Sequence, residues 1–246
     1  PLFNRVISGL YSPGSTIKPF IGMAALQEEV VSPSDTIENC VDITIPNPFD
    51  PEHPYIFKNW RPDLGPFNLR RAIAQSCNVY FFTVGGGFGK ILGLGVDRIV
   101  RALTVAMANV TLGIDLPGEI SGFIPTPEWK LRTKRENWYQ GDTYNISIGQ
   151  GDLIVTPLWL NTYISAIANG GTLYKPMVAD RILDEHDNPI TVFQPQVLTQ
   201  LPFREDVIRE MRSDMRETVL SGTAKQLNNL PVPVAAKTGT TEIVAG

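Results

Sequence analysis

The stretch of sequence that decides the fold covers residues 12–20 and reads Ser12-Pro13-Gly14-Ser15-Thr16-Ile17-Lys18-Pro19-Phe20. Its first four residues are typical of a helix beginning, where short polar side chains and proline are favoured. Apolar residues then recur at roughly helical spacing as far as Leu26, and Ser32-Pro33 ends the pattern. We therefore predict a helix over residues 15–29, with Ser15 and Lys18 on one face because residues three apart share a face.

Further helices are predicted from periodic apolar residues and from residues that favour helix ends. One of them begins at Asn68 and ends at a break at 76–78. The others cover residues 96–107, 157–168 and 204–220. The helix over 157–168 has the most complete boundary signals, because Thr156 and Pro157 start it and Asn169-Gly170 stop it.

Strand signals are fewer and shorter. Seven prolines make residues 33–67 an expected loop region, apart from a short strand at 41–45. Residues 177–183 and 190–193 flank a turn-forming stretch and predict a hairpin. Residues 232–241 are rich in β-branched side chains and predict a last strand.

Composition excludes several classes of protein. The chain has 246 residues, of which 43% are hydrophobic and 19% charged, so it is globular rather than disordered. A net charge of −4 gives no electrostatic case for a nucleic-acid partner. The longest uncharged run, 153–174, is interrupted by proline, asparagine and glycine, which excludes a membrane-spanning helix there.

Metal and cofactor sites are not expected. The two cysteines, Cys40 and Cys77, and the two histidines, His53 and His186, lack the number and spacing of zinc ligands. Two cysteines also exclude a disulfide framework, and we expect Cys77 to be a small packed side chain.

Glycine-rich and basic segments give no nucleotide site. The cluster at 85–89 precedes Lys90, but Val84 and Ile91 stand where a P-loop needs glycine and a hydroxyl residue. The basic run at 130–135 is predicted to be a solvated loop. Ala236-Lys237-Thr238 fails as a P-loop in the same way, because Pro231 replaces its first glycine.

Ser15 and Lys18 offer a different chemistry, that of a nucleophilic serine with a lysine base. His53 and His186 lie in charged or proline-rich turns, so a Ser-His-Asp triad is not supported. At its ordinary pKa of about 10.4, only about one lysine in a few thousand is neutral at pH 7. The pKa of Lys18 must therefore be lowered by burial or by a neighbouring cation, and a second lysine would serve.

Two further motifs accompany Ser15 and Lys18. Ser76-Cys77-Asn78 follows 61 residues after Ser15, at the predicted helix break, and Lys237-Thr238-Gly239-Thr240 follows another 161 residues later. In this order, the three motifs are those of penicillin-binding proteins and class A β-lactamases, with Cys77 in place of the usual aspartate.

The sequence resembles the transpeptidase domain of class B penicillin-binding proteins, and most nearly the penicillin-binding protein 2 group that serves cell elongation. The resemblance extends over nearly the whole chain and is carried by residues 11–20, 75–82, 141–151, 221–224 and 237–240. Trp159 and Ala236 stand where the family would have glutamine and glycine, which affects packing more than chemistry.

The resemblance implies an α+β fold, the β-lactamase/transpeptidase-like fold, in which helices flank an antiparallel sheet and a mostly helical subdomain is attached. Residues 1–246 would form one partial domain, truncated at both ends, with the anchor, the pedestal and the terminal strands absent. Sheet edges would then be exposed, so we expect this piece alone to be poorly soluble or inactive.

The resemblance also implies roles for eight residues in cross-linking stem peptides through a serine acyl-enzyme. Ser15 would be the nucleophile and Lys18 the base. Ser76 and Asn78 would relay protons and hold the substrate amide. The last motif would bind the terminal carboxylate and the substrate backbone through Lys237, Thr238, Gly239 and Thr240. Backbone N–H groups of Ser15 and Thr240 would form the oxyanion hole.

The same resemblance implies peptidoglycan stem peptides and β-lactam antibiotics as ligands, with no cofactor, metal or nucleic acid. A membrane glycan polymerase and elongation-complex proteins would be partners, on the extracytoplasmic (periplasmic) side of the cell membrane. Two alternatives stay open: a serine β-lactamase or D,D-carboxypeptidase, and a non-enzymatic β-lactam-sensing receptor domain. An elongation role and a division role are also both open.

Overall fold

A buried helix, α2 (Lys18–Gln27), passes through the middle of the protein, whose computed structural model describes residues 3–47 and 50–241. Nine of the ten residues of α2 are buried, because its neighbours cover it on all sides. A 3-10 turn, η1 (Gly14–Ile17), precedes it and carries Ser15. The predicted helix over 15–29 is therefore confirmed, with a tighter first turn.

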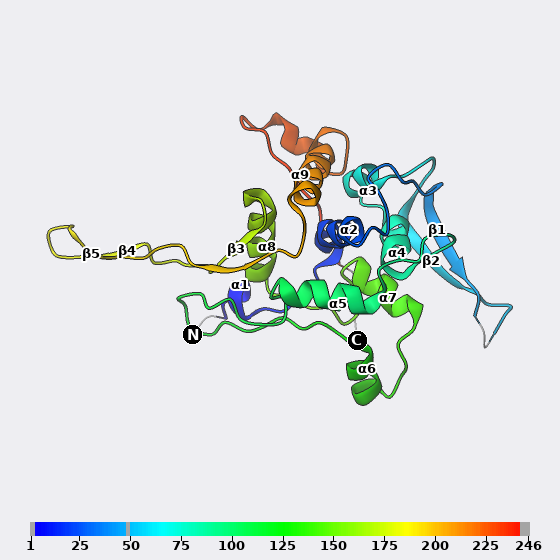
Figure 1. Cartoon of the computed structure of the whole chain (residues 1–246), viewed down its shortest axis with the longest axis horizontal. Helices are drawn as coiled ribbons and strands as arrows, with labels where there is room; N and C mark the ends of the chain where they lie inside the picture. Colours follow the sequence, from blue (N-terminus) through cyan, green and yellow to red (C-terminus); the bar gives the residue numbers. More distant parts are fainter. Residues whose placement is uncertain (1–2, 48–49, 242–246) are drawn as a thin grey trace.

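Four helices pack against α2 (Figure 1). These are α3 (Leu69–Gln75), α4 (Asn78–Gly86), α5 (Gly95–Val105) and α9 (Glu205–Leu220). The remaining helical elements are α1 (Arg5–Ser8), α6 (Pro127–Lys134), α7 (Gln140–Ser147), α8 (Pro157–Asn169) and the 3-10 turn η2 (Lys225–Asn229). Across the described residues, no helix combines the length and the apolar character that a membrane crossing needs.

The predicted helix boundaries hold where capping residues mark them. The Thr156 hydroxyl accepts a hydrogen bond from the backbone N–H of Trp159 at 3.1 Å, and Gly170 ends α8 in the left-handed conformation. The break at 76–78 is confirmed as well, because Ser76 has a φ of 57° and separates α3 from α4.

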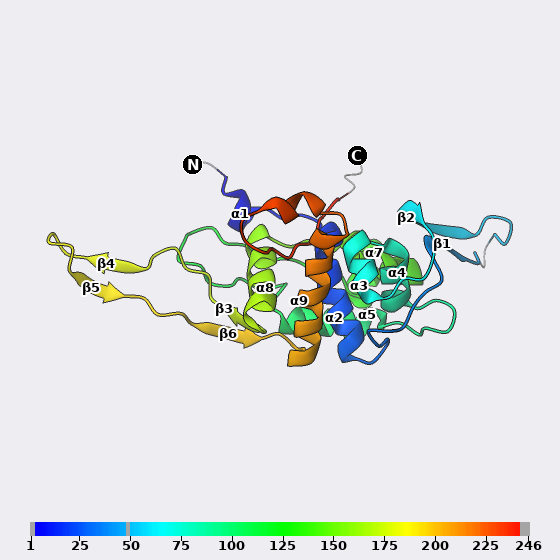
Figure 2. The same ribbon diagram turned by 90° about the horizontal axis from the view of Figure 1, so that it is seen from above.

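The strands form three separate antiparallel pairs within the described residues. They are β1 (Cys40–Ile45) with β2 (Tyr55–Asp63), β3 (Thr172–Tyr174) with β6 (Val197–Gln200), and β4 (Arg181–Leu183) with β5 (Pro189–Val192). The β4–β5 pair is the predicted hairpin and projects from the helices, opposite the β1–β2 pair (Figure 2). Helices with antiparallel strands confirm the α+β class.

The predicted strand at 232–241 is wrong, because these residues, all of them described, form no ladder. This segment is bonded to a helix instead of a strand. The N–H of Ala236 donates to the Met215 carbonyl at 3.0 Å, and Arg216 donates to the Val234 carbonyl at 2.7 Å. A β-branched sequence pairs as a strand only where a neighbouring strand is present.

Several elements were not predicted, namely α1, α6, α7, β2, β3, β6 and the 3-10 turn η2. Strand β2 lies in the proline-rich region, where Pro62 coincides with an irregularity of the β1–β2 register and so removes no ladder hydrogen bond. Helix α6 holds most of the basic run that we expected to be a solvated loop. Lys130 is buried there and its Nζ atom lies 2.7 Å from Asp142 Oδ2.

An aromatic cluster joins α2 to α8. The ring of Phe20 packs against those of Trp159, Tyr163 and Phe203, with centroids between 5.1 and 6.3 Å apart. The indole N–H of Trp159 donates to the Ala106 carbonyl at 2.8 Å. Trp159, one of the two departures from the family pattern, is therefore a packing residue, as predicted.

A disulfide bond joins Cys40, the first residue of β1, to Cys77. Our expectation that Cys77 is buried is confirmed, but the expectation that it is a free packed side chain is wrong. The two cysteines are 37 residues apart in sequence, and the fold brings their Cα atoms to 6.0 Å, within the range that a disulfide requires. The bond attaches the β1–β2 pair directly to the junction of α3 and α4.

Reduction of this bond is expected to destabilise the fold. Closing a loop of this size stabilises a protein by roughly 3–4 kcal/mol, chiefly by restricting the unfolded chain. Urea unfolding of the complete protein should therefore show a lower midpoint after reduction and alkylation than in the oxidised form. A Cys40→Ala, Cys77→Ala variant should unfold like the reduced form and ignore reductant; equal midpoints for the oxidised and reduced protein would contradict the prediction.

Candidate active site

Residues of all three motifs line one cavity of about 580 Å³. Ser15 comes from η1, Ser76 and Asn78 from the junction of α3 and α4, and Thr238 and Thr240 from the segment that follows η2. These segments are far apart in the sequence, and their meeting at one cavity is what the motif order predicted.

Lys18 lies fully buried behind this cavity. Its Nζ atom donates to the carbonyl of Ser76 at 2.8 Å, to Oδ1 of Asn78 at 2.7 Å and to Oγ of Ser76 at 3.3 Å. The left-handed backbone of Ser76 allows its carbonyl and its hydroxyl to face the same amine. Lys18 thus holds the first motif against the second.

Lys237 reaches the same hydroxyl from the other side. Its Nζ atom donates to Oγ of Ser76 at 2.8 Å and to the carbonyl of Thr238 at 3.0 Å. The Ser76 hydroxyl therefore lies between two lysine amines, and it connects the first motif to the third.

The pKa values of both lysines are lowered, which favours their neutral form. Burial, and next the positive charge of Lys237, lower the pKa of Lys18 well below its ordinary value. Burial also lowers the pKa of Lys237, to about 7. The sequence had predicted burial or a second lysine as the cause, and the structure contains both.

Ser15 is half-buried and lines the cavity, but its hydroxyl is not bonded to Lys18. Their spacing predicted one shared helix face, from which the Lys18 amine can reach the Ser15 hydroxyl. Within the described residues, the Lys18 amine is directed to Ser76 and Asn78 instead. The hydrogen bonds of the second motif therefore decide the direction of the Lys18 amine.

The Lys237-Thr238-Gly239-Thr240 segment packs directly on η1. A side chain on Gly239 would begin 2.7 Å from Cγ2 of Thr16, so only glycine lets the two segments approach this closely. The hydroxyls of Thr238 and Thr223 lie 2.7 Å apart, which ties the segment to the residues after α9.

The cavity contains further side chains that we had not assigned to the site. They are Lys58 and Trp60 of β2, Phe82 of α4, Asn145 of α7, Ile148, Gln150 and Gly151 after it, and Thr223. Asn145, Phe82 and Thr223 belong to stretches that carry the family resemblance, so a signal for them existed. Lys58 and Trp60 had none, because β2 itself was not predicted.

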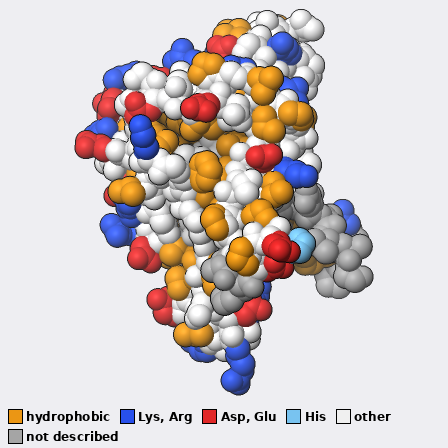
Figure 3. Space-filling model, turned by 90° about the vertical axis from the view of Figure 1, so that its right-hand side faces the viewer, with side chains coloured by type: hydrophobic (Ala, Val, Ile, Leu, Met, Phe, Trp, Pro, Cys, Tyr) orange, Lys and Arg blue, Asp and Glu red, His pale blue; other side chains and the backbone are white. Residues whose placement is uncertain are grey.

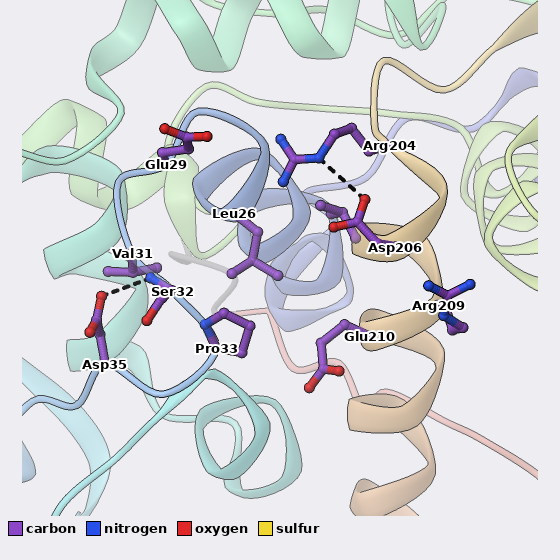
Figure 4. Close-up of a pocket in the computed structure, with 11 residues that line it drawn as sticks. Leu26, Glu29, Val31, Ser32, Pro33, Asp35, Arg204, Asp206, Arg209 and Glu210 are labelled. Atoms are coloured by element: carbon purple, nitrogen blue, oxygen red, sulfur yellow. Dashed lines mark hydrogen bonds and ion pairs between the residues drawn. The ribbon is translucent and has the colours of Figure 1, made fainter.

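A second cavity of similar volume lies between α9 and the turn that follows α2 (Figure 4). Arg204 pairs with Asp206 there, and the carboxylate of Asp35 accepts a hydrogen bond from the N–H of Ser32. None of the eight predicted site residues lines it. We do not assign it a chemical role.

The histidines and acidic residues offer no metal site within the described ranges. His53 and His186 are exposed, as predicted, and each lies beside a carboxylate of its own loop. Figure 3 shows the face of the molecule on the β1–β2 side, where hydrophobic side chains form separate patches among charged ones.

Comparison with known proteins identifies the family. The model of the family described as "Penicillin binding protein transpeptidase domain" matches residues 1–246. Peptidoglycan D,D-transpeptidase MrdA of Acinetobacter baumannii is 32% identical over 247 residues, which cover 99% of this chain and 34% of that protein. MrdA of Salmonella typhimurium is 29% identical and covers 99% of this chain and 38% of that protein.

Solved structures agree in fold. Penicillin-binding protein 2 of Helicobacter pylori has a TM-score of 0.82 and 28% identity, over 99% of this chain and 43% of that one. The Pseudomonas aeruginosa protein of the same name, in complex with WCK 5153, has a TM-score of 0.79 and 30% identity, over 97% and 52%.

The fold and the three motifs are those of a penicillin-binding transpeptidase domain, and this chain belongs to that family. The relatives compared here carry the names MrdA and penicillin-binding protein 2. The chain spans about a third of the length of the curated relatives it matches.

The lowered pKa of Lys237 predicts a pH-dependent stability. A lysine whose pKa falls on folding binds fewer protons in the folded state, so stability rises with pH between about 7 and about 10.4. In Lys237→Gln, this rise should be smaller by about 1–2 kcal/mol, after discounting for the half-exposed side chain. Urea unfolding at pH 7 and pH 9.5 measures it. The distant, exposed Lys90→Gln is the control; an unchanged rise in Lys237→Gln would refute the prediction.

Proposed function

We propose that this domain is a serine D,D-transpeptidase that cross-links peptidoglycan stem peptides and is inhibited by β-lactams. The observation that carries the proposal is the continuous connection from Lys18 through Ser76 to Lys237, at the cavity that Ser15 lines. Relatives named peptidoglycan D,D-transpeptidase support the same reaction.

Acylation would begin with Ser15 Oγ attacking the carbonyl of the penultimate D-Ala. The serine proton passes to the neutral amine of Lys18, which burial and Lys237 favour. The C–N bond to the terminal D-Ala then breaks, and the leaving amine takes a proton through the Ser76 hydroxyl. Hydrogen bonds of this kind often tighten only when substrate is bound, so a Ser15–Lys18 contact belongs to that state.

The remaining motif residues would hold the peptide. Asn78 binds the substrate amide, and Lys237 and Thr238 bind the terminal carboxylate. Gly239 lets an extended peptide lie close to the segment. The N–H groups of Ser15 and Thr240 would stabilise the oxyanion, each by roughly 3 kcal/mol. An amine of a second stem peptide then attacks the ester, which forms the cross-link and frees Ser15.

The lining of the cavity favours transpeptidation over rapid hydrolysis. A β-lactamase or a carboxypeptidase needs a group that activates water against the acyl-enzyme. None of the described residues that line the cavity is an aspartate, a glutamate or a histidine. A non-enzymatic receptor stays the other alternative, and it would differ in lacking acceptor-amine turnover.

The disulfide supports an extracytoplasmic location, because such bonds form and persist in oxidising compartments. We propose that the domain faces the periplasmic side of the cell membrane, attached by an anchor. One similar structure is a complex of penicillin-binding protein 2 with MreC from Helicobacter pylori, and another is a peptidoglycan synthase complex. By analogy, we propose a membrane glycan polymerase and elongation-complex proteins as partners, and an elongation role.

The nucleophile assignment is tested by mass spectrometry of the complete protein after exposure to penicillin. One penicilloyl group should be added to the wild-type protein, on the peptide that contains Ser15. Ser15→Ala should gain no such mass, because the proposed mechanism assigns the attack on the lactam carbonyl to the Ser15 hydroxyl alone. Ser12→Ala is the matched control and should acylate normally; labelling of Ser15→Ala would show that the assignment is incorrect.

The lifetime of that adduct separates the enzyme classes. Because no acidic side chain lines the described part of the cavity, the penicilloyl ester should survive for minutes or longer. Intact mass measured at intervals after excess penicillin is removed gives its decay. Loss within seconds would favour the β-lactamase alternative, while a stable adduct combined with cross-linking of stem peptides would favour the transpeptidase.

A further inference from the structure

Strand β2 contributes two side chains to the cavity that none of the three motifs includes. Lys58 and Trp60 lie two residues apart, so they point to the same face of the strand. The alternate residues Phe57 and Asn59 point to the other face. Phe57 packs on Phe82 and Tyr144, and Asn59 contacts Asn78.

Lys58 is an exposed cation without a partner. Its side chain forms no hydrogen bond and no ion pair within the described ranges 3–47 and 50–241. Asp42 lies directly opposite in the β1–β2 register, yet the two side chains make no ion pair. The other lysines of the site, Lys18 and Lys237, are both bonded to Ser76, so Lys58 is free to bind an anion in the cavity.

Trp60 is held in a fixed position beside Lys58. Its indole N–H donates to the Gln75 carbonyl at 3.3 Å, and the guanidinium of Arg61 lies 4.5 Å from its ring centroid. The side chain is nevertheless 54% exposed. It therefore offers an apolar surface at the edge of the cavity that needs no rearrangement to receive a ligand.

The strand is also fixed to the second motif. Oδ1 of Asn59 accepts a hydrogen bond from the backbone N–H of Asn78 at 2.8 Å, and the Cys40–Cys77 disulfide joins β1 to the same junction. Lys58 and Trp60 are thus positioned relative to Asn78, which is the residue that would hold the substrate amide.

We propose that Lys58 is a specificity-determining residue that binds a second carboxylate of the donor peptide, distinct from the terminal carboxylate that Lys237 and Thr238 would bind. Trp60 covers the apolar part of the same peptide. The inference rests on the proposed function, and it defines the substrate more narrowly, as a peptide with an anionic group upstream of the scissile amide.

The test uses the complete protein and two synthetic peptides that end in D-Ala-D-Ala and differ only in one upstream side chain, a carboxylate or its carboxamide. The rate of Ser15 acylation is measured for each peptide. Wild-type protein should prefer the carboxylate by about fivefold, as one partly exposed ion pair allows. Lys58→Gln should abolish this preference, Lys58→Arg should keep most of it, and added salt should reduce it.

Three controls keep the outcomes separate. Lys90→Gln removes an exposed lysine that does not line the cavity and should leave the preference unchanged. Asp42→Asn removes the carboxylate opposite Lys58 and should increase the preference. Urea unfolding midpoints should be nearly equal in all variants, which shows that they are folded, and acylation of wild-type protein and Lys90→Gln by labelled penicillin shows that Ser15 is reactive.

A wild-type protein that reacts with penicillin but does not distinguish the two peptides overturns the inference about Lys58 and leaves the proposed function intact. A preference that persists in Lys58→Gln overturns it as well. A protein that reacts with neither penicillin nor peptide contradicts the proposed function itself.

Discussion

The buried amine of Lys18 is the interaction on which the site depends. A buried amine with unsatisfied hydrogen bonds is costly in a protein interior, and the three hydrogen bonds to Ser76 and Asn78 satisfy the amine of Lys18. The same bonds fix the junction of α3 and α4 against α2. The packing of α2 and the arrangement of the first two motifs therefore depend on the same contacts.

Ser76 extends this constraint to the last motif, because its hydroxyl also accepts a hydrogen bond from Lys237. The segment around Gly239 then packs on η1, which carries Ser15. Three segments from different parts of the chain are held by a few short contacts rather than by a continuous sheet. The disulfide adds a covalent link on the β1 side of the junction. Each contact that orders the cavity also lowers the pKa of a lysine or restrains a motif residue.

Local signals predicted the longer helices and the three motifs, whereas the short helices α1, α6 and α7 were not predicted. Thr156, Pro157 and Gly170 mark α8 by capping, and the three motifs have fixed residue types. The predictions were wrong where contacts between distant segments decide the local structure. Residues 232–240 have strand-forming side chains but no strand beside them, β2 tolerates Pro62 only because the register is irregular there, and the Cys40–Cys77 pairing depends on two segments that meet in space. Lys58 and Trp60 were missed for the same reason.

The burial of α2 limits how this protein can change over generations. Nine of its ten residues have no solvent-facing side on which a substitution would be tolerated, so most changes there would cost packing. The opposite holds for β2, where Lys58 and Trp60 are exposed. Inherited substitutions should therefore accumulate on β2 at the edge of the cavity, while α2, which carries Lys18, stays nearly constant.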